Sequence, residues 1–406
     1  MIKIKFLNHP LRFITNYNFK LIGIYTMKVD GYCDERFISV KHAFERNFDL
    51  RLEVGASFAV SLKGNLVVDI WGGYADATKT KQWEKDTIVN VFSTTKVMTA
   101  LCVHLLVDRG LIDLDAPVAK YWPEFAQNGK DNIPVRYLLS HSAGLPGWDQ
   151  KIPVEVLYDW DKTIELLAAQ KPWWKPGTKI GYHMITFGYL LGELVRRVTG
   201  KTLGTFFKEE IADPLNIDFH IGLSEEYDSI TADLILPEEI FAKWQILLVK
   251  LFFRKAVKVF YNPDLNKADY NGRAWRAAEI PASNGHGNAR SIANIGSILA
   301  CGGKFNNKKI LSLSTVVNAI EPQISGRDVV MMYAPAKFGL GFGLLNNDLL
   351  LGPRSFYWSG AGGSLCIMDL EKKLSIGYAM NKMHMKGKDP RTGSLIKAVW
   401  DSINSE

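Results

Sequence analysis

The amino-acid sequence predicts an α+β (mixed α/β) fold, in which an antiparallel sheet flanked by helices adjoins a mainly helical lobe. Three observations support this prediction. Patterns typical of β-hairpins lie near both ends of the chain, patterns typical of helices fill its middle, and no repeat or Pro/Gly/Ser linker divides it. Because strands lie at both ends, we expect the two ends to meet in one sheet.

The hairpins are predicted from β-rich runs that flank short turns. Near the N-terminus, residues 57–62 and 66–71 flank Lys63-Gly64-Asn65. Near the C-terminus, residues 364–369 and 374–381 flank a charged turn, and residues 394–403 follow as a short helix.

Helices are predicted where apolar residues recur at helical spacing. The predicted segments are 95–108, ending before Gly110; 163–169; 186–198, ending before Gly200; and 242–260. Residues 241–261 are unusually apolar and basic. We interpret them first as a packed helix, second as a lid over an apolar pocket and third as a membrane-surface helix.

Length and composition favour one unit with two lobes. With 406 residues and 47% hydrophobic composition, the chain can bury a sizeable core. We expect a basic N-terminal extension at residues 1–28 and a single domain at 29–406. Its sheet lobe would span about 29–120 and 285–406, and its helical lobe about 121–284. The cleft between the lobes is the expected site.

The net charge of +7 does not indicate nucleic-acid binding, because much of it lies at one end. Residues 1–28 hold five of the 49 basic residues and no acid, which leaves 44 basic against 42 acidic residues elsewhere. The longest apolar run there is too short for a secretory signal, and Met27 could be the physiological start. No segment has the length of a membrane span, so we expect a cytoplasmic protein for which membrane binding is not favoured.

The four cysteines do not form a metal-binding or disulfide pattern. Cys33, Cys102, Cys301 and Cys366 are far apart, with no CxxC or Cys/His spacing. We interpret them as buried thiols in a reducing compartment and expect neither a metal nor a cofactor.

A candidate nucleophile opens the most strongly helical segment. In Ser93-Thr94-Thr95-Lys96, serine and lysine are three residues apart, so both side chains lie on one helical face. A serine needs a base to become nucleophilic, and a buried, neutral lysine can serve as one. A helix N-terminus would also favour a developing oxyanion. The pattern alone is weak, since it also fits a Ser cap with an exposed Lys.

Two further motifs strengthen the interpretation of Ser93 as a nucleophile. One is Tyr182-His183-Met184, which follows Pro176-Gly177-Thr178, and the other is the run 358–363, WSGAGG. In order and spacing, Ser-x-x-Lys, a later Tyr and a [Lys/Trp/His]-x-Gly strand resemble the class C β-lactamases, the penicillin-binding proteins and the family VIII carboxylesterases. The runs 111–117, 135–146 and 284–290 resemble the same superfamily, and the resemblance covers about residues 50–385.

The resemblance implies a fold like that of the β-lactamases and penicillin-binding proteins, and acyl transfer through a covalent serine ester. Ser93 would be the nucleophile, Lys96 its proton partner and Tyr182 the phenol that moves protons to the leaving group and from water. The backbone N–H groups of Ser93 and Ala361 would form the oxyanion hole. The expected substrate contacts are Trp358, Ser359, Gly360, Ala361 and His286, the last with a turn-stabilising role as the alternative.

Two departures from the class C pattern favour an esterase. Met184 replaces an Asn that helps to hold the β-lactam amide side chain, and Trp358 replaces a Lys near the substrate carboxylate. Two apolar groups in place of an amide and a cation favour neutral acyl chains. We therefore expect a serine carboxylesterase acting on small, short-chain esters, with weak β-lactam hydrolysis as a side activity. The alternatives are a β-lactamase or D-alanyl-D-alanine peptidase and, ranked lower, a non-catalytic structural or binding module.

Two other interpretations were weighed. An α/β-hydrolase needs Gly-x-Ser-x-Gly, and no serine in the chain has that context. His141 is interpreted as a hydrogen-bonded structural residue, with a triad base as the alternative. His183 is expected to point away from Tyr182 or to line the rim. The oligomeric state is left open.

Overall fold

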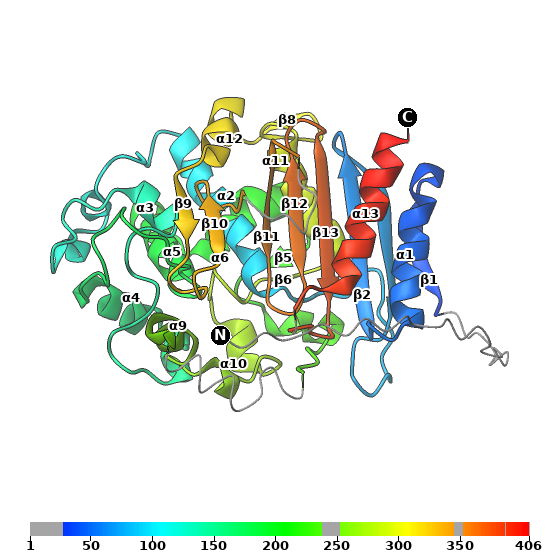
Figure 1. Ribbon diagram of the computed structural model, residues 1–406, viewed down its shortest axis with the longest axis horizontal. Coiled ribbons are helices and arrows are strands. Elements are labelled where there is room, and N and C mark those ends of the chain that lie inside the picture. The colour runs from blue at the N-terminus through cyan, green and yellow to red at the C-terminus, as the bar shows by residue number, and fades with distance from the viewer. Residues whose placement is uncertain (1–26, 238–251, 345–351, 386, 406) are drawn as a thin grey trace, which may run out of the picture.

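The structure, a computed structural model, describes residues 27–237, 252–344, 352–385 and 387–405. Its main feature is a six-stranded sheet in the order β1-β3-β2-β13-β12-β11, in which every neighbouring pair is antiparallel. The strands are β1 (Val29–Cys33), β2 (Gly55–Leu62), β3 (Asn65–Gly73), β11 (Ser355–Ser359), β12 (Leu365–Asp369) and β13 (Leu374–Met380). The predicted meeting of the two chain ends in one antiparallel sheet is confirmed, as is the fold class (Figure 1).

Turn chemistry explains the N-terminal hairpin. β2 and β3 are joined by Lys63 and Gly64, which have φ values of 54° and 88°. Two consecutive residues with positive φ are what a two-residue hairpin turn needs to match the twist of the strands. Both predicted hairpins are confirmed, and the turns lie side by side, since Lys63 N donates to Lys373 O at 2.8 Å.

Helices cover both faces of the sheet. On one face, α1 (Ile38–Asp49) and α13 (Pro390–Asn404) pack against each other and against the strands (Figure 1). On the other, α11 (Ala289–Ala300) packs against β2, β12 and β13. Gly377 allows this close approach, because a Cβ there would lie 2.2 Å from Ala289 O. α13 begins earlier than predicted, at Pro390, because Asp389 caps it.

The middle of the chain is mainly helical. Its longer helices are α2 (Lys96–Asp108), α4 (Trp160–Ala169) and α5 (Thr186–Thr199), and α5 ends at Gly200 in the left-handed conformation, as predicted. The shorter ones are α3 (Val135–Leu139), α6 (Leu203–Phe207), α7 (Asp213–Leu215), α9 (Arg254–Phe260) and α10 (Arg273–Ala277), and α12 (Leu313–Ile320) follows α11. Residues 96–106 of α2 are all buried, and α2 packs against α5, α6 and α12. A helix buried on every side is a central element of the core.

Short strands connect the helical part to the sheet. β4 (Val89–Asn90), β6 (His286–Gly287) and β5 (Phe219–His220) form a small sheet that brings the segment before α2 beside the segment before α11. β9 (Ile324–Arg327) pairs with β10 (Pro335–Phe338), and β7 (Lys304–Phe305) with β8 (Lys308–Lys309). The predicted lobe boundaries stay predictions.

Two predictions need correction. The helix predicted at 242–260 is not continuous: residues 242–251 lie outside the described residues, and the backbone is non-helical at Phe253, before α9. The cysteines are free thiols, but only Cys102 and Cys366 are buried. Cys33 lies on the edge strand β1 and Cys301 at the end of α11, so both are partly accessible. Within the described ranges, no helix is long and apolar enough to cross a membrane.

Candidate active site

Ser93 lies in a single 3₁₀ turn, Phe92–Thr95, that leads into α2. Side chains three residues apart are eclipsed in a 3₁₀ turn, which brings Ser93 and Lys96 together more closely than an α-helix would. Phe92, directly before the serine, has a φ of 43°, and a bulky side chain rarely adopts positive φ. Such strain beside a candidate nucleophile is typical of active sites, and no sequence pattern predicts it here.

The side chain of Lys96, including its terminal nitrogen, is fully buried. Its Nζ lies 2.7 Å from Met184 O, 2.9 Å from Ala282 O and 3.1 Å from Ser93 Oγ. Burial lowers the pKa of Lys96 well below its ordinary value, which favours a neutral amine. A neutral amine has two N–H groups and one lone pair, so when both carbonyls are satisfied the lone pair faces Ser93 Oγ. Lys96 can therefore accept the serine proton.

Tyr182 approaches the same oxygen from the other side. Its Oη lies 2.8 Å from Ser93 Oγ. Burial raises the pKa of Tyr182 to about 12, and its hydrogen bond with Ser93 opposes that rise. The phenol is therefore protonated at neutral pH and donates to Ser93 Oγ. The structure thus brings the three predicted residues Ser93, Lys96 and Tyr182 into one hydrogen-bonded group.

Asp328 positions the tyrosine, and sequence reasoning missed it. Its buried carboxylate accepts from Tyr182 N at 3.0 Å and also from the backbone N–H groups of Val330 and Met331. It follows β9 and lies 146 residues from Tyr182 in the sequence. No local motif surrounds it, so only the fold identifies it.

Trp358 forms an aromatic wall beside Tyr182. The two ring centroids are 5.9 Å apart, and the indole also stacks on Phe338 at 5.6 Å. Trp358 is only 5% exposed, so it offers substrate little surface of its own. This packing places an uncharged indole beside the phenol ring. Trp358 thus contacts Tyr182 directly.

The loop after β11 faces the nucleophile turn. Ser359, at the end of the strand, is exposed, whereas Gly360 and Ala361 are half-buried. Gly360 allows the close approach of the two segments, because a Cβ there would lie 2.2 Å from Val91 O. Within the described part of the chain, neither Ser93 N nor Ala361 N donates to an acceptor. Both N–H groups are therefore free to bind an oxyanion.

The histidines near these motifs form structural hydrogen bonds with the backbone. His141 Nδ1 accepts from His183 N, and His183 Nε2 accepts from Leu145 N, both at 3.1 Å. Burial lowers the pKa of His183 to about 3, so it stays neutral. The structural interpretation of His141 is therefore supported over a triad base. His183 is buried and does not line a rim.

His286 is not brought into the group. It is 1% exposed and lies in β6 between Asn90 of β4 and His220 of β5, and among the described residues no hydrogen bond joins it to Ser93, Lys96 or Tyr182. Burial, with the charge of Arg276, lowers the pKa of His286 to about 3. The expected substrate contact therefore has no support in the geometry. The described residues also contain no group of three or more His, Cys, Asp or Glu placed to hold a metal ion.

Comparison with known families agrees with this arrangement. The family model described as Beta-lactamase matches residues 44–399. The chain belongs to the Beta-lactamase family. This assignment confirms the resemblance seen in the motifs, since the matched range contains Ser93, Lys96, Tyr182 and Trp358.

Three relatives illustrate the position of the chain within the family. It is 35% identical over 363 residues to "Esterase/beta-lactamase LipL" of Mycobacterium tuberculosis (strain ATCC 25618 / H37Rv), covering 88% of this chain and 83% of that protein. A crystal structure of a family VIII carboxylesterase aligns with a TM-score of 0.85 at 39% identity, covering 92% of this chain and all of the other. A penicillin-binding protein homologue from Caulobacter crescentus aligns with a TM-score of 0.83 at 35% identity and the same coverage.

Proposed function

We propose that this protein is a serine carboxylesterase that hydrolyses small, short-chain carboxylic esters through a covalent acyl-enzyme. The observation that carries the proposal is the position of Ser93 Oγ, 3.1 Å from Lys96 Nζ and 2.8 Å from Tyr182 Oη. A nucleophile held between a base and an acid is what acyl transfer requires. The names of its relatives, an esterase/β-lactamase and a family VIII carboxylesterase, support the same class.

Acylation follows from the geometry. Lys96 takes the proton from Ser93, and Oγ attacks the ester carbonyl carbon. The carbonyl oxygen, now negative, binds the N–H groups of Ser93 and Ala361. The intermediate then releases the alcohol, which takes the proton from Tyr182 Oη, and Lys96 returns the serine proton to the phenolate. The Nζ atom of Lys96 lies 4.9 Å from the centre of the Tyr182 ring.

Deacylation repeats these steps with water in place of the alcohol. Lys96, neutral again, takes a proton from water, whose oxygen attacks the acyl carbon, and Ser93 Oγ then leaves with the proton that Lys96 returns. Every proton stays within the three side chains and the reactants. The mechanism therefore uses no metal or cofactor.

Trp358 and Met184 favour an ester over a penicillin-like substrate. Trp358 places an uncharged indole beside Tyr182, so it offers no ionic partner to a substrate carboxylate. Met184 contributes its backbone carbonyl to Lys96, while its half-buried side chain packs against the core. β-Lactamase or D-alanyl-D-alanine peptidase activity is the second candidate, because the same three residues could open a β-lactam and one relative carries both names.

The test compares p-nitrophenyl acetate, butyrate and octanoate with nitrocefin. Wild type should turn over the acetate and butyrate esters far faster than nitrocefin, and Ser93→Ala should abolish turnover and labelling by a fluorophosphonate. Ser297→Ala is the matched control, since this buried serine lies on α11 and its side-chain partners among the described residues are Ser61 and Cys301. Faster nitrocefin turnover would favour the β-lactamase, and labelling that persists in Ser93→Ala would contradict the nucleophile.

A further inference from the structure

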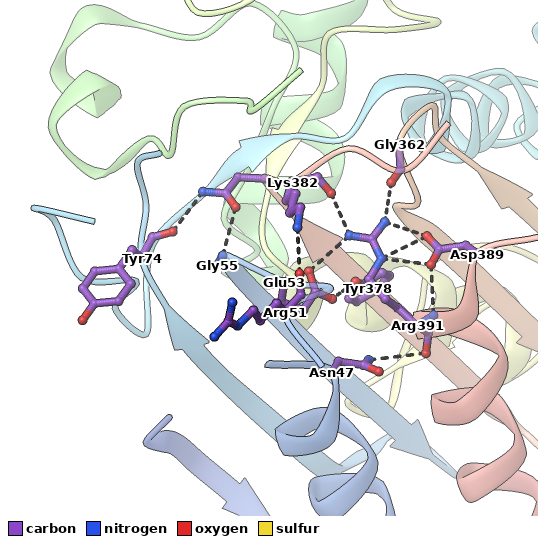
Figure 2. Close-up of polar contacts among 11 residues, drawn as sticks. Asn47, Arg51, Glu53, Gly55, Tyr74, Gly362, Tyr378, Lys382, Asp389 and Arg391 are labelled. Atoms are coloured by element: carbon purple, nitrogen blue, oxygen red, sulfur yellow. Dashed lines mark hydrogen bonds and ion pairs between the residues drawn. The ribbon is translucent and has the colours of Figure 1, made fainter. Parts of the chain in front are cut away.

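Arg391 lies at the start of α13 and is almost completely buried, with 1% of its side chain exposed. A guanidinium has five N–H donors, and here each direction meets an acceptor (Figure 2). The acceptors are Gly362 O at 2.6 Å, Lys382 O at 2.7 Å, Glu53 Oε2 at 3.2 Å and the two carboxylate oxygens of Asp389 at 2.6–3.1 Å. The side chain therefore has one well-defined position.

Stability alone does not explain such a cluster. Glu53 is as buried as Arg391 and also accepts from the Tyr378 hydroxyl. Taking two charges out of water costs much of what their attraction returns, and apolar replacements of buried ion pairs are often equally stable. A buried ion pair can instead fix one geometry, and the geometry to explain here is that of Gly362.

The guanidinium holds the loop that carries Ala361. Gly362 O accepts from Arg391 Nη2 at 2.6 Å and from His384 N at 2.9 Å, so its peptide is held by two donors. The next residue, Gly363, leaves the space that the guanidinium fills, because a Cβ there would lie 2.6 Å from Nη2 and from Asp389. The loop and the arginine therefore fit each other closely.

The other end of the loop is tied to the nucleophile turn. Ser364 Oγ donates to Val91 O at 2.6 Å and lies 3.0 Å from Thr94 Oγ1. Between the two anchors, Gly363 N donates to Gly360 O at 3.2 Å, which orients the peptide whose N–H belongs to Ala361. The carbonyl oxygen of Gly360 accepts this bond inside the turn. Because the C=O and N–H of a trans peptide point in opposite directions, the N–H of Ala361 points out of the turn.

We propose that Arg391 is a positioning residue of the oxyanion hole, which fixes Ala361 N–H opposite Ser93 through its bond to Gly362 O. This inference rests on the proposed esterase function. Loss of one oxyanion donor costs about 10²- to 10³-fold in kcat, and a shift of about 1 Å can cost about 10²-fold. The ground-state ester needs this donor far less than the tetrahedral intermediate does, so the loss should fall on kcat and not on KM.

The test uses Arg391→Lys, which keeps the charge near Glu53 and Asp389 but has no planar fork to reach Gly362 O at the same time. With p-nitrophenyl butyrate, kcat should fall by about 10²-fold while KM changes by less than about threefold. The affinity for an alkyl boronic acid, which forms a tetrahedral adduct on the serine, should fall in parallel with kcat. A residue that served only stability would leave the boronic acid affinity of the folded protein unchanged.

Two further variants separate positioning from folding. Lys130→Met removes a buried cation that lies far from this loop in the sequence. Lys130 donates to the backbone carbonyls of Gln127, Ala168 and Gln170, so the variant should have a lower thermal midpoint and an unchanged kcat. Asp389→Asn keeps the shape of the carboxylate but weakens its hold on Arg391, so it should lower kcat in the same direction by a smaller factor. It serves as the test if Arg391→Lys does not fold.

The outcomes are distinct. If wild type hydrolyses the ester and the folded variants keep wild-type kcat and boronic acid affinity, this inference is wrong and the esterase proposal stands. If wild type hydrolyses no ester, the proposed function and this inference fail together. Parallel losses of kcat and boronic acid affinity, absent from Lys130→Met, would support it.

Discussion

Two lysines, one beside the candidate nucleophile and one in a loop far from it in the sequence, are buried in the same way and surrounded differently. Lys96, at the start of α2, and Lys130, in the loop before α3, both have 0% exposure. Lys130 donates to three backbone carbonyls, whereas Lys96 meets two carbonyls and the hydroxyl of Ser93. Both lysines are buried and contact two backbone carbonyls, but the third partner is a hydroxyl for Lys96 and a carbonyl for Lys130.

This difference shows that burial alone does not make a base. Three carbonyls match the three N–H groups of an ammonium, so the environment of Lys130 suits the charged form and joins a loop to the end of α4. Burial lowers the pKa of Lys130 to about 8, with Asp131 opposing the change, so it is still mostly charged at neutral pH. Two carbonyls and a hydroxyl suit a neutral amine, and only such an amine can accept the proton of Ser93.

The largest effect should come from Lys96→Met, which keeps the length of the side chain but removes the base. We expect kcat/KM for p-nitrophenyl butyrate to fall by about 10²- to 10⁴-fold. Lys130→Met, measured in parallel, should keep kcat/KM within about twofold. Equal losses of kcat/KM in both variants would contradict the idea that contact with the Ser93 hydroxyl makes Lys96 the base.

Tyr182→Phe should come next, because it removes one hydroxyl from the same group. The alcohol would leave without a proton donor, so kcat should fall by about 10²-fold with the fold retained. Tyr189→Phe is the matched control, since Tyr189 lies on α5 and its buried hydroxyl donates to Leu157 O. Near-normal turnover by Tyr182→Phe would remove the tyrosine from the mechanism.

The pH dependence sharpens the comparison further. Activity requires Lys96 without its proton, so kcat/KM should fall as pH decreases through the lowered pKa of Lys96, well below 10.5. It also requires Tyr182 with its proton, so kcat/KM should fall again near pH 12. Lys130→Met should leave both limbs in place, and an acid limb that persists in Lys96→Met would belong to another group.

The smallest effect on rate, and a clear one on stability, should come from Lys130→Met. Three buried carbonyls lose their donor, which should cost about 2–4 kcal/mol of unfolding free energy. Thermal unfolding followed by circular dichroism should show a midpoint lower by several degrees. An unchanged midpoint would show that water or a shifted backbone replaces the lysine.

Local motifs were enough to find part of the site. Ser93 and Lys96 are three residues apart, so any helical turn brings them together, and Tyr182 and Trp358 were found through the family resemblance. Asp328 and Arg391 were not found, because each is a single charged residue without a motif. His286 was assigned to the substrate from a Gly-rich segment, but it is buried in β6 between β4 and β5.

The sequence by itself determined some of the elements and the local half of the candidate site: the two hairpins, α2 and α5, and the spacing of Ser93 and Lys96. These follow from turn chemistry and from periodicities of a few residues. Only the tertiary structure decided which carbonyls surround Lys96, how Asp328 holds Tyr182 across 146 positions and how Arg391 meets Glu53 across 338. Such contacts depend on how strands and helices pack, and no short stretch of sequence contains that information.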